Sequence, residues 1–277
     1  MKKILIAALL GVVAVCASAA AQETQWQRFN DRNVTMAALQ PTWIGPLIQS
    51  DARLTQGARF SVARSSVPGT EIFSYGNNHG VSLIAGTRWQ FDFNPPSFFR
   101  NHCAALPDGW GNASAQVKYR IASGNRDHGN FAVTAILFHG FASGAGQNGA
   151  LTAYYVPKLA AGKAFGRFFD VQSTLSGVLP TGKIDQQGRA IEWNLTGQLH
   201  PASRLYFDIE NNAAFNLGGP ADGKAQNFIT PAAFFIMRRN DWGPRHPVPV
   251  IDGGMQIATS QFHCDNHNLI VDLRILF

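Results

Sequence analysis

The sequence of 277 residues predicts an all-β protein, and more narrowly an antiparallel transmembrane β-barrel of about twelve strands. Three observations predict this class. Apolar and polar residues alternate along many segments, the polar positions of these segments are rich in charge, and aromatic residues gather near the segment ends. Alternation with a period of two indicates a strand with two different faces. A membrane barrel turns the apolar face outward to lipid and the polar face inward to water.

The N-terminal segment has the layout of an export signal. Lys2 and Lys3 precede an apolar stretch, and a run of alanines ends at Ala21. The apolar stretch is too short to span a membrane as a helix. We therefore expect residues 1–21 to be a signal peptide that is cleaved near Ala21, and the protein to be exported to the bacterial outer membrane.

Residues 22–40 lack the period of two that marks the rest of the mature chain. We expect this stretch to be a periplasmic leader or a plug of the barrel lumen. The barrel itself is then expected to comprise residues 41–277.

The alternating segments account for most of the remaining chain. In residues 88–94, for example, Trp89, Phe91 and Phe93 alternate with polar residues. The segments are about 9 to 13 residues long, which suits a strand tilted across a bilayer better than an ordinary globular strand. Strands are expected near residues 41–50, 53–64, 81–94, 113–123, 130–141, 152–162, 167–179, 189–200, 203–215, 226–238, 249–262 and 267–277. Ten strands are the alternative, because the first pair has the weakest pattern.

The polar face of these strands carries charges of both signs, which we expect to line the lumen. The expected lumen charges are Arg88, Asp92, Lys118, Arg120, Glu192, Arg204, Asp208, Glu210, Asp272 and Arg274. A soluble barrel or sandwich with its apolar face inward shows the same alternation. So much charge on one face favours the membrane barrel over this alternative. The net charge of +6 is spread along the chain without a block of Lys and Arg, so we expect no nucleic-acid partner.

The two cysteines of the mature chain fall in connections at the same end of the expected barrel. With the C-terminus in the periplasm, Cys103 and Cys264 both lie outside, and the exported compartment favours a disulfide between them. A zinc site with the neighbouring His102 and His263 is the alternative, but the spacing matches no standard zinc motif. We expect neither a metal nor another cofactor.

The connection that contains Cys103 also carries two adjacent aromatic residues, Phe98 and Phe99. Pro95 and Pro96 stiffen the backbone before them. We expect this loop to present both rings at the outer mouth, either as a contact for a solute or as packing into the barrel.

The chain ends on the alternating segment "NHNLIVDLRILF". In a closed barrel the last strand pairs with the first and therefore does not fray. We expect Phe277 to act as an assembly signal. The expected partners are outer-membrane lipid, the barrel-assembly machinery and a small-molecule solute.

Two segments carry a resemblance to a known family. They are "HPASRLYFDIENNAAFNLGGPADGKAQNFITPAAFF" (200–235) and "DGWGNASAQVKYRI" (108–121). They resemble a family of bacterial outer-membrane barrels of transporter type that carry the label of a MetA pathway of phenol degradation. The resemblance covers about residues 80–277. It implies a barrel of the twelve-strand type and the passage of small, often apolar compounds, and it carries over no catalytic or binding residues.

The expected function is that of an outer-membrane channel or transporter for small solutes, hydrophobic ones among them, rather than that of an enzyme. A closed structural or adhesive barrel is the first alternative. A lipid hydrolase in the barrel wall is the second, with Ser143 and either His139 or His200 as its candidate residues. The sequence has no G-x-S-x-G motif around a nucleophile, which argues against it.

Overall fold

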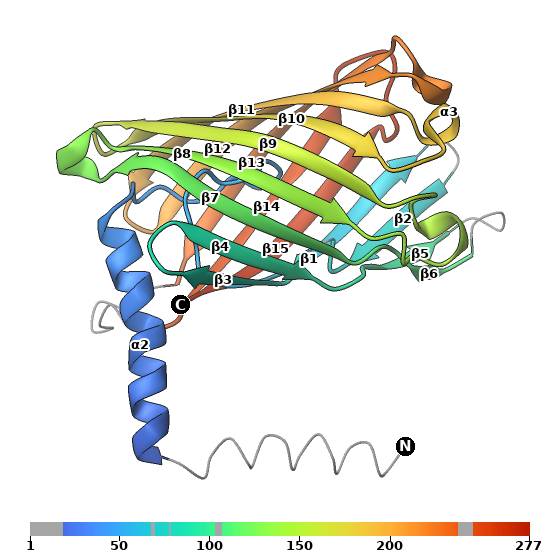
Figure 1. Ribbon diagram of the computed structural model, residues 1–277. Helices are drawn as coiled ribbons and strands as arrows, with labels where there is room; N and C mark the ends of the chain where they lie inside the picture. Colours follow the sequence, from blue (N-terminus) through green and yellow to red (C-terminus); the bar gives the residue numbers. More distant parts are fainter. Residues whose placement is uncertain (1–18, 68–69, 78, 103–106, 238–245) are drawn as a thin grey trace.

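The computed structural model describes residues 19–67, 70–77, 79–102, 107–237 and 246–277. The chain forms a closed barrel, and one helix, α2 (Ala19–Ala38), projects from one end of it (Figure 1). No described helix is long and apolar enough to cross a membrane. The expected signal peptide lies almost wholly outside the described residues, so its cleavage near Ala21 stays a prediction.

The barrel wall consists of twelve antiparallel strands, three of which are split into two segments. The split strands are β2 (Thr70–Tyr75) with β3 (Val81–Ala85), β4 (Trp89–Asn94) with β5 (Phe98–Asn101), and β6 (Gly109–Trp110) with β7 (Ser114–Gly124). The continuous strands are β1 (Gly57–Val67), β8 (Phe131–Gly140), β9 (Tyr154–Phe165), β10 (Phe169–Pro180), β11 (Arg189–Ala202), β12 (Leu205–Leu217), β13 (Ala225–Ile236), β14 (Val248–Ala258) and β15 (His267–Leu276). Short helices lie in four connections: η1 (Arg126–His128), η2 (Gly146–Asn148), α3 (Ile184–Gln187) and η3 (Gly219–Ala221).

The first and last strands close the barrel. β1 pairs with β15 in antiparallel register from Gly57 opposite Leu276 to Ser66 opposite His267. Closure pairs the two strands that would otherwise be free edges of the sheet. The predicted fold class, an antiparallel barrel of about twelve strands, is confirmed.

Two of the expected strands are wrong, although the total is right. Residues 41–50 form no strand, and residues 81–94 form the hairpin of β3 and β4 rather than one strand. β2, at residues 70–75, was not expected at all. The first error has a local cause, because Gly45 and Pro46 interrupt the segment and proline removes a donor from a strand ladder.

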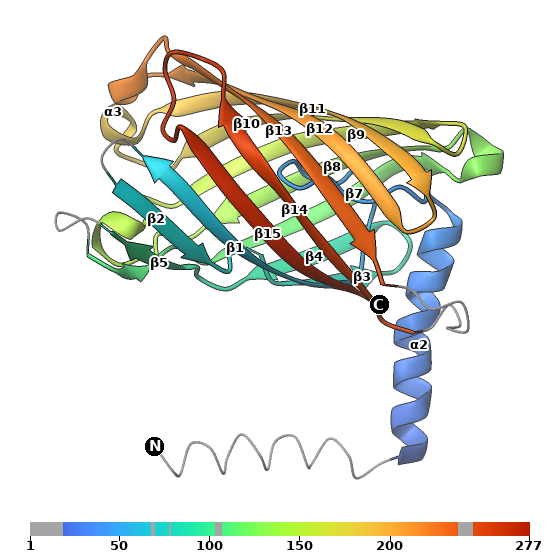
Figure 2. The same cartoon turned by 180° about the vertical axis from the view of Figure 1, so that it is seen from behind.

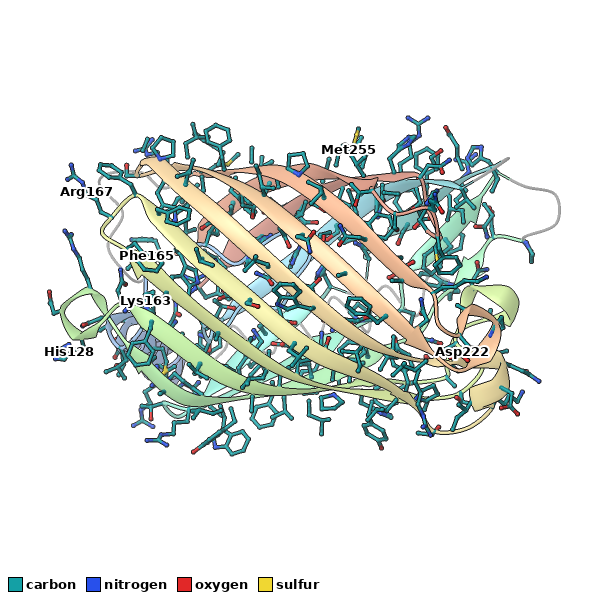
Figure 3. The ribbon with its side chains drawn as sticks, turned by 90° about the horizontal axis from the view of Figure 1, so that it is seen from above. His128, Lys163, Phe165, Arg167, Asp222 and Met255 are labelled. Carbon is teal, nitrogen blue, oxygen red and sulfur yellow. The ribbon has the colours of Figure 1, made fainter. Side chains whose placement is uncertain are left out.

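The apolar side chains of the wall point outward. On β10, Leu175 is 53% exposed, whereas its neighbours Thr174 and Ser176 are buried. Figure 3 shows the same for Phe165 and Met255, which point away from the barrel. This is the orientation of a barrel surrounded by lipid, and it is the reverse of a soluble barrel with an apolar interior.

The two ends of the barrel differ. We call the end next to α2 the helix end; the C-terminal residue lies there too (Figures 1 and 2). It carries the connections 86–88, 125–130, 166–168 and 203–204, and the described residues 237 and 246–247 between β13 and β14. We call the opposite end the loop end; it carries the connections 141–153, 181–188, 218–224 and 259–266, and the described residues 102 and 107–108 between β5 and β6.

Candidate functional site

The segment between α2 and β1 lies inside the barrel. We call residues 39–56 the lumen loop; Figures 1 and 2 show it within the wall. Its two ends meet, because the side-chain amide of Gln40 donates to the Leu54 carbonyl at 2.7 Å and accepts from the Leu54 nitrogen at 3.0 Å. A compact loop with adjacent ends is an Ω-loop, and such loops are often functional. This one enters and leaves the lumen at the helix end.

Glu210 on β12 binds the tip of the lumen loop. Its carboxylate accepts hydrogen bonds from the backbone nitrogens of Leu47 at 2.5 Å and of Ile48 and Gln49 at 3.0 Å each. Glu210 is fully buried. Hydrogen bonds to an ionised acceptor are stronger than neutral ones. Three of them on one carboxylate hold the turn of the loop against β12.

Two arginines bind the same turn through its carbonyl groups. Arg274 on β15 donates to the carbonyls of Gly45 at 2.8 Å and Pro46 at 3.1 Å, and Arg59 on β1 donates to that of Leu47 at 2.6 Å. Each arginine is also paired with a wall carboxylate: Arg274 with Asp252 at 2.8 Å and Arg59 with Asp272. The turn is thus held between an anion at its N–H groups and cations at its carbonyls.

The returning half of the loop takes its hydrogen bonds from polar side chains of five further strands. These bonds are Thr174 to the Ser50 carbonyl at 3.2 Å, Lys158 to the Ser50 hydroxyl at 3.1 Å, Lys118 to the Asp51 carbonyl at 3.1 Å, Thr134 to the Ala52 carbonyl, and the Thr55 nitrogen to Gln90 at 2.7 Å. A buried backbone must satisfy its N–H and C=O groups. Here the inward polar face of the wall does this in place of a strand partner.

Asp51 connects the two halves of the loop. Its carboxylate accepts from the Arg53 guanidinium at 2.8 Å and from the indole N–H of Trp43 at 3.4 Å. Burial by itself raises the pKa of Asp51, but the charges of Arg53 and Lys118 and the Arg53 hydrogen bonds outweigh burial, so this pKa lies below its ordinary value. Asp51 is therefore ionised at neutral pH.

Small residues of the wall make room for the apolar side chains of the loop. Trp43 packs with Ala132 and Ala160, and a Cβ atom at Gly162 would lie only 2.8 Å from its ring. A Cβ atom at Gly254 would lie equally close to the side chain of Leu47. Trp43 and Leu47 are almost fully buried, and burial of such a side chain contributes about 1.5 to 3 kcal/mol. The wall is shaped to hold this loop.

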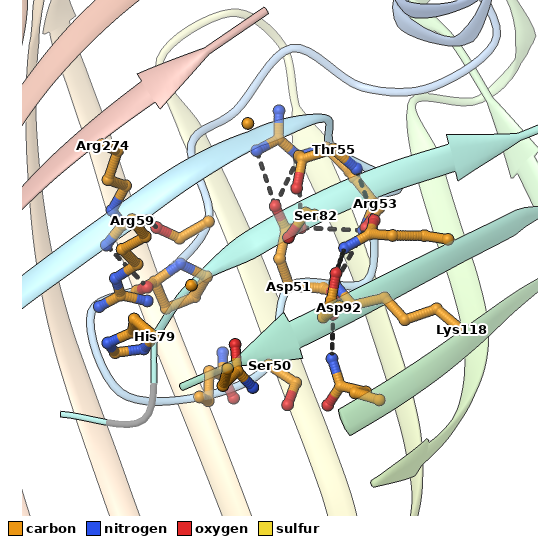
Figure 4. A pocket seen from close by; sticks show the side chains of 18 of the residues that line it. Ser50, Asp51, Arg53, Thr55, Arg59, His79, Ser82, Asp92, Lys118 and Arg274 are labelled. Carbon is orange, nitrogen blue, oxygen red and sulfur yellow. Dashed lines mark hydrogen bonds and ion pairs between the residues drawn. The ribbon is translucent and has the colours of Figure 1, made fainter. Parts of the chain in front are cut away.

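Two of the cavities in the described part of the barrel lie beside the loop. The wall cavity, of about 230 Å³, lies between the loop and the wall, and Figure 4 shows the charged side chains around it. The vestibule cavity, of about 280 Å³, lies toward the loop end. Both are bounded by Ile48, Gln49 and Ser50, so the tip of the lumen loop separates them.

The structure places most of the expected lumen charges inside the barrel. The buried, inward ones are Asp92, Lys118, Arg120, Asp208, Glu210, Asp272 and Arg274. Glu192 is half-buried beside the vestibule cavity and accepts from the Ser176 hydroxyl at 2.8 Å. Arg88 and Arg204 were wrongly expected there: both are exposed in turns at the helix end, because the strands end before them.

Sequence reasoning missed the uncharged side chains that bind the loop. Gln198 accepts from the Ile44 nitrogen, and Gln172 donates to the Ile44 carbonyl, both at 3.2 Å. The usable signal was the sequence "WIGPLIQ", which is apolar but broken by Gly-Pro and therefore suits a buried loop better than a strand.

The two aromatic residues of the expected outer loop belong to a strand. Phe98 and Phe99 lie in β5, half-buried, and the ring of Phe98 is 5.2 Å from that of Trp110. The expectation of a stiff loop that presents both rings is thus wrong, because the chain resumes strand pairing with β2 and β6 directly after Ser97.

The disulfide and the assembly signal stay predictions. Cys103 lies outside the described residues, while Cys264 is an exposed free cysteine whose thiol donates to Gln226 at 3.5 Å. The backbone nitrogen of Phe277 donates to the Gln56 carbonyl at 2.9 Å, and its ring lies 5.9 Å from that of Phe29 on α2.

The residues suggested for a lipid hydrolase have other contacts. Ser143 accepts from the Ala113 nitrogen at 2.9 Å, and His200 bonds Asp170 at 2.5 Å. A different serine does meet a histidine, since the Ser61 hydroxyl lies 2.6 Å from Nδ1 of His79. Ser61 is fully buried and on the inward face of β1, away from lipid. This geometry does not favour lipid hydrolysis.

Comparisons with known proteins concern the fold. No family model and no curated protein matches the chain. An outer-membrane channel from Pseudomonas putida F1 has a similar structure, with a TM-score of 0.57 and 13% identity over 85% of this chain and 100% of that chain. The NanC porin has a TM-score of 0.53 and 10% identity over 79% of this chain and 98% of that chain. The chain is thus similar in fold to these two outer-membrane proteins.

Proposed function

We propose that the protein is a channel of the bacterial outer membrane for small solutes, and that the lumen loop is its constriction. The apolar exterior of the closed barrel supports insertion into lipid. The two solved structures of similar fold are described as an outer-membrane channel and a porin, which supports the same location and activity.

The observation that carries this proposal is the polar space beside the loop. The wall cavity reaches from Gly57 and Leu276 near the helix end to Asn94 and Gln116 toward the loop end. Charged and amide side chains line it, and such a lining holds water. A barrel whose only role is structural has no need of a polar cavity along its loop.

The lumen loop is attached to the wall without strand pairing. From Pro41 to Thr55, the described hydrogen bonds between loop and wall come from wall side chains such as Glu210 and Arg274, and not from strand pairing. Displacing the loop would leave the closed barrel intact, because no ladder of the wall depends on it. The loop therefore sets the width of the lumen without being part of the wall.

The side chains that line the two cavities also indicate the polarity of the solute. Both cavities are bounded mainly by polar side chains. This lining favours polar solutes over the hydrophobic ones that the family resemblance implies.

The test is conductance in planar lipid bilayers. Wild-type protein is expected to give small, stable steps, and Glu210→Ala larger or fluctuating ones, because three loop N–H groups lose their acceptor. Asp185→Ala is the matched control, since it removes an exposed carboxylate from α3, a residue that lines neither cavity. If neither wild type nor Glu210→Ala conducts, although both run as folded barrels on a heat-modifiability gel, the protein is a closed structural barrel.

A further inference from the structure

Uncharged polar side chains of the wall gather around the vestibule cavity. Six inward side chains from five neighbouring strands bear amides or hydroxyls: Thr174, Ser176, Asn194, Asn212, Gln226 and Gln256. Strand register brings them together, since Thr174 lies opposite Asn194, and Asn194 opposite Asn212. Amides and hydroxyls each offer both donors and acceptors. The hydroxyl groups of a polyol need the same two roles.

Gln49 borders this cavity and carries an acceptor without a donor. Gln49 is only 5% exposed, and its Nε2 donates to Thr196 at 2.7 Å. Its Oε1 is buried and accepts no hydrogen bond from the described residues. A buried polar atom left unpaired costs about 1 to 3 kcal/mol. A ligand hydroxyl that reaches this oxygen from the cavity would satisfy it and would at the same time contact the lumen loop.

The charges beside the cavity are of both signs, and two of them are already bonded to wall or loop hydroxyls. Lys158 already donates to Ser50 at 3.1 Å, and Glu192 accepts from Ser176 at 2.8 Å. Asp265 adds a second negative charge at the loop end. An anion would face these two carboxylates, and a cation would face the Lys158 ammonium. Phe228 adds one apolar surface, against which the C–H face of a sugar ring can pack.

We propose that the vestibule cavity binds a small, uncharged, polyhydroxylated solute of the size of a monosaccharide or sugar alcohol, with one of its hydroxyls bonded to Gln49. The proposal rests on the proposed channel function, because it names the solute class that meets the lumen loop from the loop end. The ligand then sits directly on the tip that Glu210 holds in place.

The test uses folded, detergent-solubilised protein and ligand-observed saturation-transfer NMR. The neutral probes are D-glucose and sorbitol, and the charged probes of equal size are gluconate and glucosamine. We expect saturation transfer to both neutral probes and weaker transfer to the charged ones. Gln226→Ala and Gln49→Leu should each weaken binding about three- to tenfold, as expected for the loss of one neutral hydrogen bond.

Asn227→Ala is the matched control. Asn227 follows Gln226 on β13 but projects from the other face, where its amide donates to Thr259 at 2.9 Å. Binding should be unchanged in this variant. Absence of transfer to both neutral probes in folded wild type overturns the proposal. Binding by Gln226→Ala and Gln49→Leu that is as strong as that of wild type also overturns it. So does saturation transfer to gluconate that is as strong as transfer to glucose.

This assay requires no ion flow, so the two proposals can fail separately. A barrel that binds glucose through Gln226 but never conducts, even as Glu210→Ala, would remove the channel function and keep the site. A barrel that conducts but binds no neutral probe would remove the proposed site and keep the channel function.

Discussion

The carboxylate of Glu210 accepts a hydrogen bond from the backbone nitrogen of Leu47 at 2.5 Å, although 163 positions separate the two residues in the chain. The same carboxylate binds the next two nitrogens, so one wall residue satisfies three consecutive N–H groups of the lumen loop.

Glu210→Gln should loosen the turn without unfolding the barrel. The substitution removes the charge and one of the two acceptor oxygens, and a hydrogen bond to a charged group contributes about 1.5 to 3 kcal/mol. Hydrogen exchange at residues 47–49 should therefore become at least about tenfold faster. Glu192→Gln is the control. Unchanged protection in Glu210→Gln would show that the turn is held by the arginines alone.

Gly162→Ala should push Trp43 away from the wall. The new Cβ would lie 2.8 Å from the indole ring, and overpacking of this kind costs about 1 to 3 kcal/mol. The difference in fluorescence between each protein and its Trp43→Phe counterpart isolates the signal of Trp43, which should shift to the red. Gly177→Ala on β10, whose nearest neighbouring atom is 4.0 Å away, should leave it unchanged. Identical Trp43 spectra in both glycine variants would contradict the packing.

The loop should weaken in acid because of Asp51. Its pKa is lowered in the folded loop, so the released loop binds a proton more readily than the docked one. The stabilisation of the docked loop by the ionised Asp51 is complete above the ordinary pKa of 3.8. It is lost as the pH falls through the lower pKa that Asp51 has in the folded protein. The Trp43 signal should change in this range, since its indole bonds Asp51. Asp51→Asn should show a smaller change, and an equal one would assign the transition to other carboxylates.

Substitutions of three arginines should destabilise the barrel to different degrees, depending on whether the arginine lies in the lumen or in an exposed turn. Arg274→Ala leaves Asp252 and two loop carbonyls without their buried cation, and breaking a buried pair costs about 3 to 5 kcal/mol. Arg88→Ala and Arg204→Ala alter exposed turn residues and should stay within about 0.5 kcal/mol of wild type. The temperature of the heat-modifiability transition measures all three. A large loss in Arg88→Ala would place that side chain in a structural role.

Much of the wall was predictable from the sequence. The expected strands from residue 113 to the end overlap β7 to β15 closely, since a strand with lipid on one face and water on the other must alternate strictly. The inward position of charges such as Asp92 and Arg274 follows from the same alternation. Arg88 and Arg204 were misplaced because alternation with a period of two does not mark the residue at which a strand ends.

The barrel class and the two faces of most strands can thus be predicted from the sequence, because both depend on the pattern of neighbouring residues. What fills the lumen depends instead on contacts between distant parts of the chain. Residues 39–56 satisfy their backbone with side chains such as Gln90, Lys118 and Glu210, which lie on strands far along the chain. No local pattern encodes such partners, because they come together only when β1 and β15 close the barrel around the loop.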